Sequence, residues 1–168
     1  WHDLKEICPL PDKVWVVLDR VRDPGNLGTI IRTADAAGAS GVILVGETTG
    51  PFALETVRAT MGSVFAIPIY RASEQRFIEF SKSFGGMAVG THLKGSVDYR
   101  TVAYAGKPLL LIMGNEQSGL TEALAGACKT SVSEFAAAKN VLPTSADEAG
   151  CTLDAKGTQY ASALTVAK

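Results

Sequence analysis

The chain has 168 residues, of which 46% are hydrophobic and 20% are charged, so it is long enough for one globular domain with a buried core. A formal net charge of −1 excludes nucleic-acid binding that depends on overall positive charge, so any such contact must come from a local patch, a dimer surface or another domain. No apolar run approaches the length that spans a bilayer, which argues against a membrane protein.

The cysteines and histidines restrict disulfide and metal chemistry. Cys8, Cys128 and Cys151 form no C-x-x-C pair, and an odd count without a framework favours reduced thiols. With only two histidines we expect no metal site built from His and Cys. The first thirteen residues are too polar for a secretory signal, so we expect a cytoplasmic protein.

Predicted strands and helices alternate along the chain. Residues 14–18 (VWVVL) form a continuous β-branched run that is typical of a strand buried on both faces. Apolar residues then recur at helical spacing over 27–37, and Gly38 is a typical C-terminal stop. The pattern continues with a strand at 41–45, a helix at 52–60, a strand at 64–70, a helix capped by Ser73 and reaching 84, strands at 87–91 and 108–113, and a helix at 120–128.

This alternation predicts an α/β fold with a largely parallel sheet. In such sheets, ligands bind in the crevice beyond the carboxyl ends of the strands. Three loops follow predicted strands at that edge, at residues 19–26, 91–96 and 114–119. We therefore expect the functional site to be built from these three loops.

The first loop belongs to the stretch RDPGNLGTIIR, residues 22–32. Asp-Pro-Gly-Asn is a turn signal, and Asn26 can cap the following helix, so a purely structural turn is an equally good interpretation of these four residues. Arg32 follows Asn26 by six residues, and we expect both to face the same side of the helix. An arginine beside Ile31 and Ala34 is costly to bury without an anionic partner, which favours an anion contact.

The second loop lies within LLLIMGNEQSGL, residues 109–120. A plain helix entry would explain it, but its two glycines also allow the backbone to approach a ligand closely. Asn115 and Glu116 supply an amide and a carboxylate at the edge of the sheet. The third loop, GTHLKGS at 90–96, is most simply a connection, because His92 has no evident nucleophile partner.

These stretches resemble a known family. RDPGNLGTIIRTADAAG resembles motif 1, and LIMGNEQSGL motif 2, of the SpoU-type (TrmH-like) SPOUT RNA methyltransferases, and the resemblance covers about residues 14–128. It implies a parallel-sheet α/β SPOUT fold with a C-terminal trefoil knot. It also implies a homodimer that transfers a methyl group from S-adenosylmethionine to a ribose 2′-OH of tRNA or rRNA.

The resemblance also assigns roles to individual residues. Catalytic roles fall on Asn26, Arg32 and Glu116. Cofactor contacts, largely through backbone groups, fall on Thr91, His92, Leu93, Met113, Gly114 and Asn115. RNA contacts are assigned to Arg20, Arg22 and Arg32, and no metal is implied because the methyl donor is already activated.

Arg32 is an energetically unfavourable candidate for a general base. Removing the proton from an arginine near pH 7 costs on the order of 7 kcal/mol. We therefore favour Arg32 as an electrostatic clamp on an RNA phosphate and on the developing alkoxide. Asn26 and Glu116 would then orient Arg32 or the ribose.

The two ends of the chain differ in character from its middle. Residues 1–13 resemble the end of a linker from an N-terminal RNA-binding domain, and 14–168 form the expected catalytic domain. Residues 128–168 are anomalous, because no Ser-x-Asn of a third motif follows Cys128. The tail is divergent, or wrongly assigned, or unable to bind the cofactor normally. The alternatives to an enzyme are a catalytically impaired SPOUT-like module for RNA binding and dimerisation, and a flavodoxin-like ligand or signalling domain.

Overall fold

The structure is a computed structural model that describes residues 1–91, 97–115, 117–128 and 130–133. In these residues seven strands form one sheet in the order β3-β2-β1-β6-β4-β7-β5, and every neighbouring pair is parallel. The strands are β1 (Val14–Asp19), β2 (Gly41–Val45), β3 (Ile69–Ala72), β4 (Met87–Thr91), β5 (Val97–Asp98), β6 (Leu109–Met113) and β7 (Thr130–Ser133). The predicted parallel α/β fold is confirmed.

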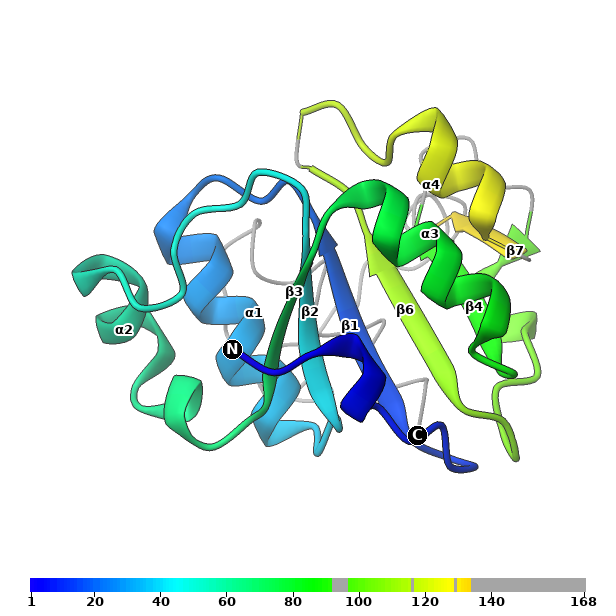
Figure 1. The fold of residues 1–168 in the computed structure, drawn as a ribbon, viewed down its shortest axis with the longest axis horizontal. Coiled ribbons are helices and arrows are strands. Elements are labelled where there is room, and N and C mark those ends of the chain that lie inside the picture. The colour runs from blue at the N-terminus through cyan, green and yellow to red at the C-terminus, as the bar shows by residue number, and fades with distance from the viewer. Residues whose placement is uncertain (92–96, 116, 129, 134–168) are drawn as a thin grey trace, which may run out of the picture.

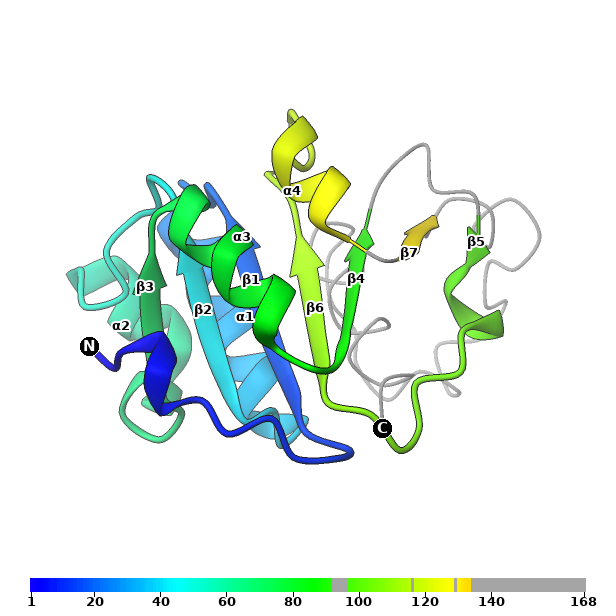
Figure 2. The same ribbon diagram turned by 45° about the vertical axis from the view of Figure 1, so that its right-hand side comes forward.

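Helices cover both faces of the sheet (Figure 1). The α-helices are α1 (Pro24–Ala36), α2 (Leu54–Thr60), α3 (Glu74–Ser83) and α4 (Glu122–Ala127), and the 3-10 helices are η1 (Leu4–Glu6), η2 (Ser63–Phe65) and η3 (Tyr99–Thr101). Because side chains alternate along a strand, Val16 and Leu18 pack toward α1, whereas Trp15 and Val17 pack toward α3. Two apolar cores therefore lie on opposite sides of the sheet. The turned view in Figure 2 shows α3 on one side of the sheet and α1 on the other.

The first helix begins three residues earlier than the sequence analysis predicts. Asp23, not Asn26, is the N-cap, and its carboxylate accepts the backbone N–H of Asn26 at 2.7 Å. Pro24 occupies the first helical position, where its fixed φ suits a helix and its missing N–H costs nothing. Asn26 therefore lies inside the first turn.

The predicted strand at 64–70 is only partly correct. Its first half forms η2, after Gly62 turns the chain at φ 99°, and β3 begins at Ile69. Pro68 has no N–H to donate to a sheet ladder, so it stands just before the strand and accepts from the backbone N–H of Val42 at 2.9 Å.

The sequence analysis did not predict β5 and β7, because neither contains a continuous apolar run. Both form beside β4, with β7 pairing to β4 and β5 pairing to β7. A strand therefore follows the second-motif helix after all. The expected trefoil knot and most of the anomalous tail fall on residues 134–168, which lie outside the described residues.

The beginning of the chain contacts the edge of the sheet. The backbone N–H of His2 donates to Ile69 at 3.1 Å, and Leu4 and Ile7 are buried in the core beneath α3. Arg76 of α3 forms two hydrogen bonds to the carboxylate of Asp3, at 2.7 and 2.8 Å. Residues 1–7 thus pack on the domain, and the interpretation of residues 1–13 as the end of a linker stays a prediction.

Candidate active site

The strand order brings together the carboxyl ends of the strands that precede the three predicted loops. β6 lies between β1 and β4, with Leu18 opposite Met113 and Gly90 opposite Ile112. All three strands are parallel, so their carboxyl ends lie at one edge of the sheet, as expected from the sequence. Residues 92–96, which follow β4, lie outside the described residues. The strand order reverses at β1: β2 and β3 follow on one side of it, whereas β6 and β4 lie on the other side. Such a switch point is where open α/β sheets bind ligands.

An ion pair stands at the end of β1. Asp19 is buried, with 1% of its surface exposed, and accepts from Nε and Nη2 of Arg20 at 2.9 and 3.0 Å. Arg20 adopts a left-handed backbone conformation, with φ 52°, which is uncommon for a residue with a side chain. The hydrogen bonds to Asp19 raise the pKa of Arg20, although partial burial of the guanidinium acts in the opposite direction. These hydrogen bonds therefore favour the charged form of Arg20.

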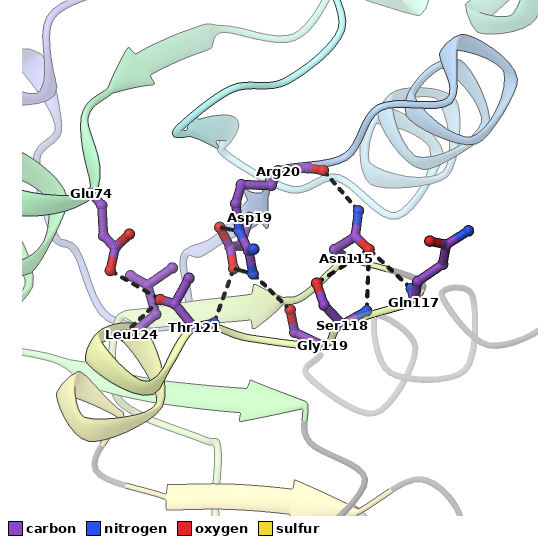
Figure 3. Close-up of polar contacts among 9 residues, drawn as sticks. All are labelled: Asp19, Arg20, Glu74, Asn115, Gln117, Ser118, Gly119, Thr121 and Leu124. Carbon is purple, nitrogen blue, oxygen red and sulfur yellow. Dashed lines mark hydrogen bonds and ion pairs between the residues drawn. The ribbon is translucent and has the colours of Figure 1, made fainter.

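The loop after β6 is a closed ring. Asn115 and Gly119 exchange two backbone hydrogen bonds, of 3.1 and 2.8 Å. Inside the ring, Oδ1 of Asn115 accepts the backbone N–H groups of Gln117 and Ser118 at 2.9 and 3.2 Å (Figure 3). Gly114 lies against Gly119, and no side chain fits between them. These contacts hold Asn115 close to Gln117, Ser118 and Gly119, the other described residues of the ring.

Thr121 connects this loop to the helices that follow. Its hydroxyl accepts the backbone N–H of Leu124 at 3.2 Å, which caps α4, and donates to Glu74 of α3 at 3.0 Å. Its backbone N–H donates to Asp19 at 3.2 Å. Figure 3 shows these contacts as a continuous chain from Glu74 to Gln117 across the edge of the sheet. Asp19, Glu74 and Thr121 were not among the site residues predicted from the sequence; the one available signal was the position of Asp19, a carboxylate directly after a buried strand.

The arginine and asparagine of motif 1 differ in burial. Arg32 is exposed on the solvent side of α1, and Asn26 is partly buried. Six residues of an α-helix place two side chains about 120° apart around the axis, so the expectation of a shared side was wrong. Arg22, in the loop before the helix, is also exposed. Both arginines are open to an anionic partner, and the costly burial considered above for Arg32 does not arise.

The predicted cofactor contacts lie at the same edge as far as they are described. Thr91 ends β4 and its hydroxyl donates to the carbonyl of Ile112 at 3.4 Å. Met113 is buried in the core, so only its backbone faces the loop, and Gly114 and Asn115 are partly exposed. His92, Leu93 and Glu116 lie outside the described residues. The residue roles stay predictions.

A partly buried thiol lies against β4. Cys128 donates from its sulfur to the carbonyl of Leu124 at 3.1 Å, and a Cβ on Gly90 would come within 2.6 Å of this sulfur. Burial raises the pKa of Cys128 to about 11. The thiol is therefore neutral near pH 7 and fills space behind β4, without acting as a nucleophile.

The described part of the chain offers neither a metal centre nor a membrane segment. Among these residues, no group of three or more His, Cys, Asp or Glu side chains could hold a metal ion. No helix within the same ranges is long and apolar enough to cross a bilayer.

Comparison with known proteins agrees with this geometry. The chain is 36% identical over 129 residues to the 23S rRNA (guanosine(2553)-2'-O)-methyltransferase RlmP of Bacillus subtilis, covering 73% of this chain and 52% of that protein. It is 35% identical over 137 residues to the 23S rRNA (uridine(2479)-2'-O)-methyltransferase of Streptomyces viridochromogenes, covering 78% and 47%. The chain thus spans about half the length of the curated relatives it matches.

A solved structure is similar over almost the whole chain. The AdoMet-bound rRNA methyltransferase from Sinorhizobium meliloti is 51% identical with a TM-score of 0.84, covering 99% of this chain and 60% of that one. The model of the SpoU rRNA Methylase family matches residues 13–137, which include both motif loops. On this evidence the chain belongs to the SpoU rRNA methylase family.

Proposed function

We propose that this chain is the catalytic part of an RNA 2′-O-methyltransferase that uses S-adenosylmethionine and acts on ribosomal RNA. The observation that carries the proposal is the junction of the motif 1 and motif 2 loops, where Asn115 donates to the carbonyl of Arg20 at 3.0 Å. Both curated relatives reported above are named as 23S rRNA 2′-O-methyltransferases, which favours rRNA over tRNA.

The edge of the sheet is suited to the cofactor. Gly114 and Asn115 are partly exposed at the end of β6, so their backbone groups are open to a ligand, whereas the space beside Gly90 is filled by Cys128 and Leu120. Thr91, Gly114 and Asn115 are the described residues that would hold it, with His92, Leu93 and Met113 as further predicted contacts. When bound, S-adenosylmethionine supplies a methyl group that is already activated for transfer.

The chain itself must position and activate the ribose hydroxyl. Arg32 and Arg22 are exposed cations on the motif 1 side of the site, suited to phosphate and to the negative charge that develops on the attacking oxygen. Asn26 and Glu116 orient the ribose or Arg32 in this proposal. Fixing the hydroxyl in line with the methyl group supplies much of the rate gain, because it removes the entropy of a bimolecular encounter.

Further parts of the protein complete the proposal. A net charge of −1 gives this chain little general attraction for RNA, so we assign substrate selection to an additional RNA-binding domain and to a homodimer surface. The curated relatives, about twice as long as the matched segment, leave room for such a domain. A cytoplasmic setting follows from an rRNA substrate.

Two measurements test the proposal. Calorimetric titration with S-adenosylmethionine is expected to give micromolar binding near one site per protomer. Transfer of a radiolabelled methyl group to rRNA, followed by nuclease digestion, is expected to yield a 2′-O-methylated nucleoside. Folded protein that binds rRNA without binding the cofactor would replace the enzyme with the impaired RNA-binding module. The assay uses the longest natural form of the chain, so that a missing domain does not limit RNA binding.

A further inference from the structure

Asp19 and Arg20 contact segments of the chain that are almost a hundred residues away. The Nη2 of Arg20 donates to the carbonyl of Gly119 at 3.1 Å, across a separation of 99 residues. Asn115 donates back to the carbonyl of Arg20 at 3.0 Å. Asp19 accepts the backbone N–H of Thr121 at 3.2 Å. Two adjacent residues thus hold the motif 2 ring at its start, its end and the residue that caps the next helix.

The geometry of Arg20 makes this arrangement depend on its side chain. The left-handed backbone at φ 52° accompanies a guanidinium that pairs with its own neighbour, Asp19. Such a conformation is unfavourable for a residue with a Cβ, so it persists only where surrounding contacts require it. One donor nitrogen, Nη2, serves both the Asp19 carboxylate and the Gly119 carbonyl.

The same contacts make Arg20 a poor partner for phosphate. Its charge is matched by a carboxylate with 1% exposure that is held by two hydrogen bonds, and only 30% of the arginine side chain is exposed. A phosphate would have to compete with this bidentate pair, whose geometry is the strongest available to arginine. Arg22, two residues further along, is exposed and forms no ion pair within the described residues.

We propose that Arg20 is a positioning residue that holds the motif 2 ring in its cofactor-binding shape, and that it does not contact RNA. The effect of Arg20 on cofactor binding rests on the proposed function, because the ring is the proposed cofactor loop. The positioning itself is a property of the protein and is tested separately. The RNA contacts on this side of the site then belong to Arg22 and Arg32.

Replacing Arg20 with lysine distinguishes a role in positioning the ring from a role in contacting an RNA phosphate. Lysine keeps the positive charge, so a phosphate contact would survive, but its single ammonium group lacks the fork that reaches Asp19 and Gly119 together. In Arg20→Lys, amide exchange in the peptide spanning residues 113–121 is expected to accelerate about tenfold or more. The dissociation constant for S-adenosylmethionine is expected to rise by about tenfold, with the salt dependence of RNA binding unchanged.

Variants of Arg100 and Arg22 serve as controls. Arg100 forms a similar bidentate pair with Asp98, but this pair is more exposed, and among the described residues the side chain of Arg100 forms no hydrogen bond to a distant segment such as the one from Arg20 to Gly119. Arg100→Lys is therefore expected to leave both the exchange rates and cofactor affinity within about twofold of the wild type. Arg22→Lys is expected to behave in the same way toward the cofactor, whereas Arg22→Met reduces the salt slope of RNA binding by about one.

Arg20→Met is the stronger variant, and its stability is measured first, because it leaves the buried Asp19 without its counter-ion. If it does not fold, Arg20→Lys alone decides. Unchanged amide exchange around the ring in folded Arg20→Lys would overturn the inference, as would a lower salt slope for RNA in Arg20→Met with normal cofactor affinity. Faster exchange in a protein whose wild type does not bind S-adenosylmethionine would support the positioning role and reject the proposed function.

Discussion

Gly114 and Gly119 lie so close together that a Cβ on Gly114 would come within 2.3 Å of the carbonyl carbon of Gly119 and 2.4 Å of the backbone nitrogen of Leu120. Backbone atoms cannot move aside as the end of a side chain can. The start and end of the motif 2 ring therefore touch only because residue 114 has no side chain. This contact gives the ring its size, and it makes the glycine testable.

Gly114→Ala is expected to open the ring. Overpacking against backbone costs about 1–3 kcal/mol of stability, and the displaced loop is expected to weaken S-adenosylmethionine binding by about tenfold or more. Urea denaturation and calorimetric titration measure the two effects. Gly126→Ala is the control, because a Cβ on this helical glycine meets no atom within 4 Å. Alanine there is expected to stabilise the protein by up to about 1 kcal/mol. Normal affinity in folded Gly114→Ala would contradict the proposed cofactor loop.

The contact between α1 and α2 depends on a second glycine. A Cβ on Gly28 would lie 2.4 Å from the Cβ of Ala59 and 2.9 Å from the carbonyl oxygen of Thr56. Gly28→Ala is therefore expected to lower the free energy of unfolding by about 1–3 kcal/mol.

Ala59→Gly offers a partial rescue of this change. Alone it is expected to cost about 1 kcal/mol, because glycine weakens a helix. Combined with Gly28→Ala it removes the closest clash. The loss of stability in the double variant is therefore expected to be smaller than the sum of the two single losses by about 0.5 kcal/mol or more. Denaturant titration of the four proteins of the cycle measures this coupling. Strict additivity would mean that the helices separate to accommodate the alanine.

Arg32 is the residue that most directly tests the mechanism. It is exposed, so Arg32→Lys and Arg32→Ala are expected to change stability by less than about 0.5 kcal/mol. Methyl transfer is expected to fall by about a hundredfold in Arg32→Ala, and substantially in Arg32→Lys, because lysine cannot reproduce a planar bidentate contact. The comparison uses kcat/KM on the same rRNA. Nearly full activity in Arg32→Lys would exclude the bidentate clamp.

The raised pKa of Cys128 leads us to expect a decline in stability at alkaline pH. Its folded pKa of about 11 lies above the ordinary value of 9.0, because burial disfavours the thiolate. The folded state therefore binds the proton more tightly than the unfolded state, and the stabilisation is complete below about pH 9 and lost as the pH rises toward 11. Cys128→Ala is expected to lower overall stability and to flatten this decline.

Thiol alkylation gives an independent measure of the same burial. Cys8 is exposed and is expected to react with iodoacetamide readily at pH 8, whereas Cys128 reacts slowly until the protein is denatured. Mass spectrometry of the digested protein separates the sites. Equal rates at Cys8 and Cys128 would contradict the burial on which the raised pKa depends.

Much of the site could be anticipated from local patterns. Continuous apolar runs such as Val14–Asp19 and Leu109–Met113 indicate strands buried on both faces, and parallel strands place their following loops at one edge. Ser73 caps α3 as expected from its position before a helical pattern. The start of α1 was misplaced because the stretch from Asp23 to Asn26 contains two good capping residues, and only the position of Pro24 decides between them.

By itself, the sequence determined the alternating strands and helices, the loops at their carboxyl ends and the family resemblance carried by two of those loops. Only the tertiary structure decided that β6 lies beside β1, so that Arg20 meets Gly119, and that β7 and β5 extend the sheet beyond β4. The physical reason is the range of the interactions. Apolar periodicity and capping act over a few residues and are visible in the sequence, whereas the partner of a strand edge or a buried carboxylate is chosen by the packing of the whole chain.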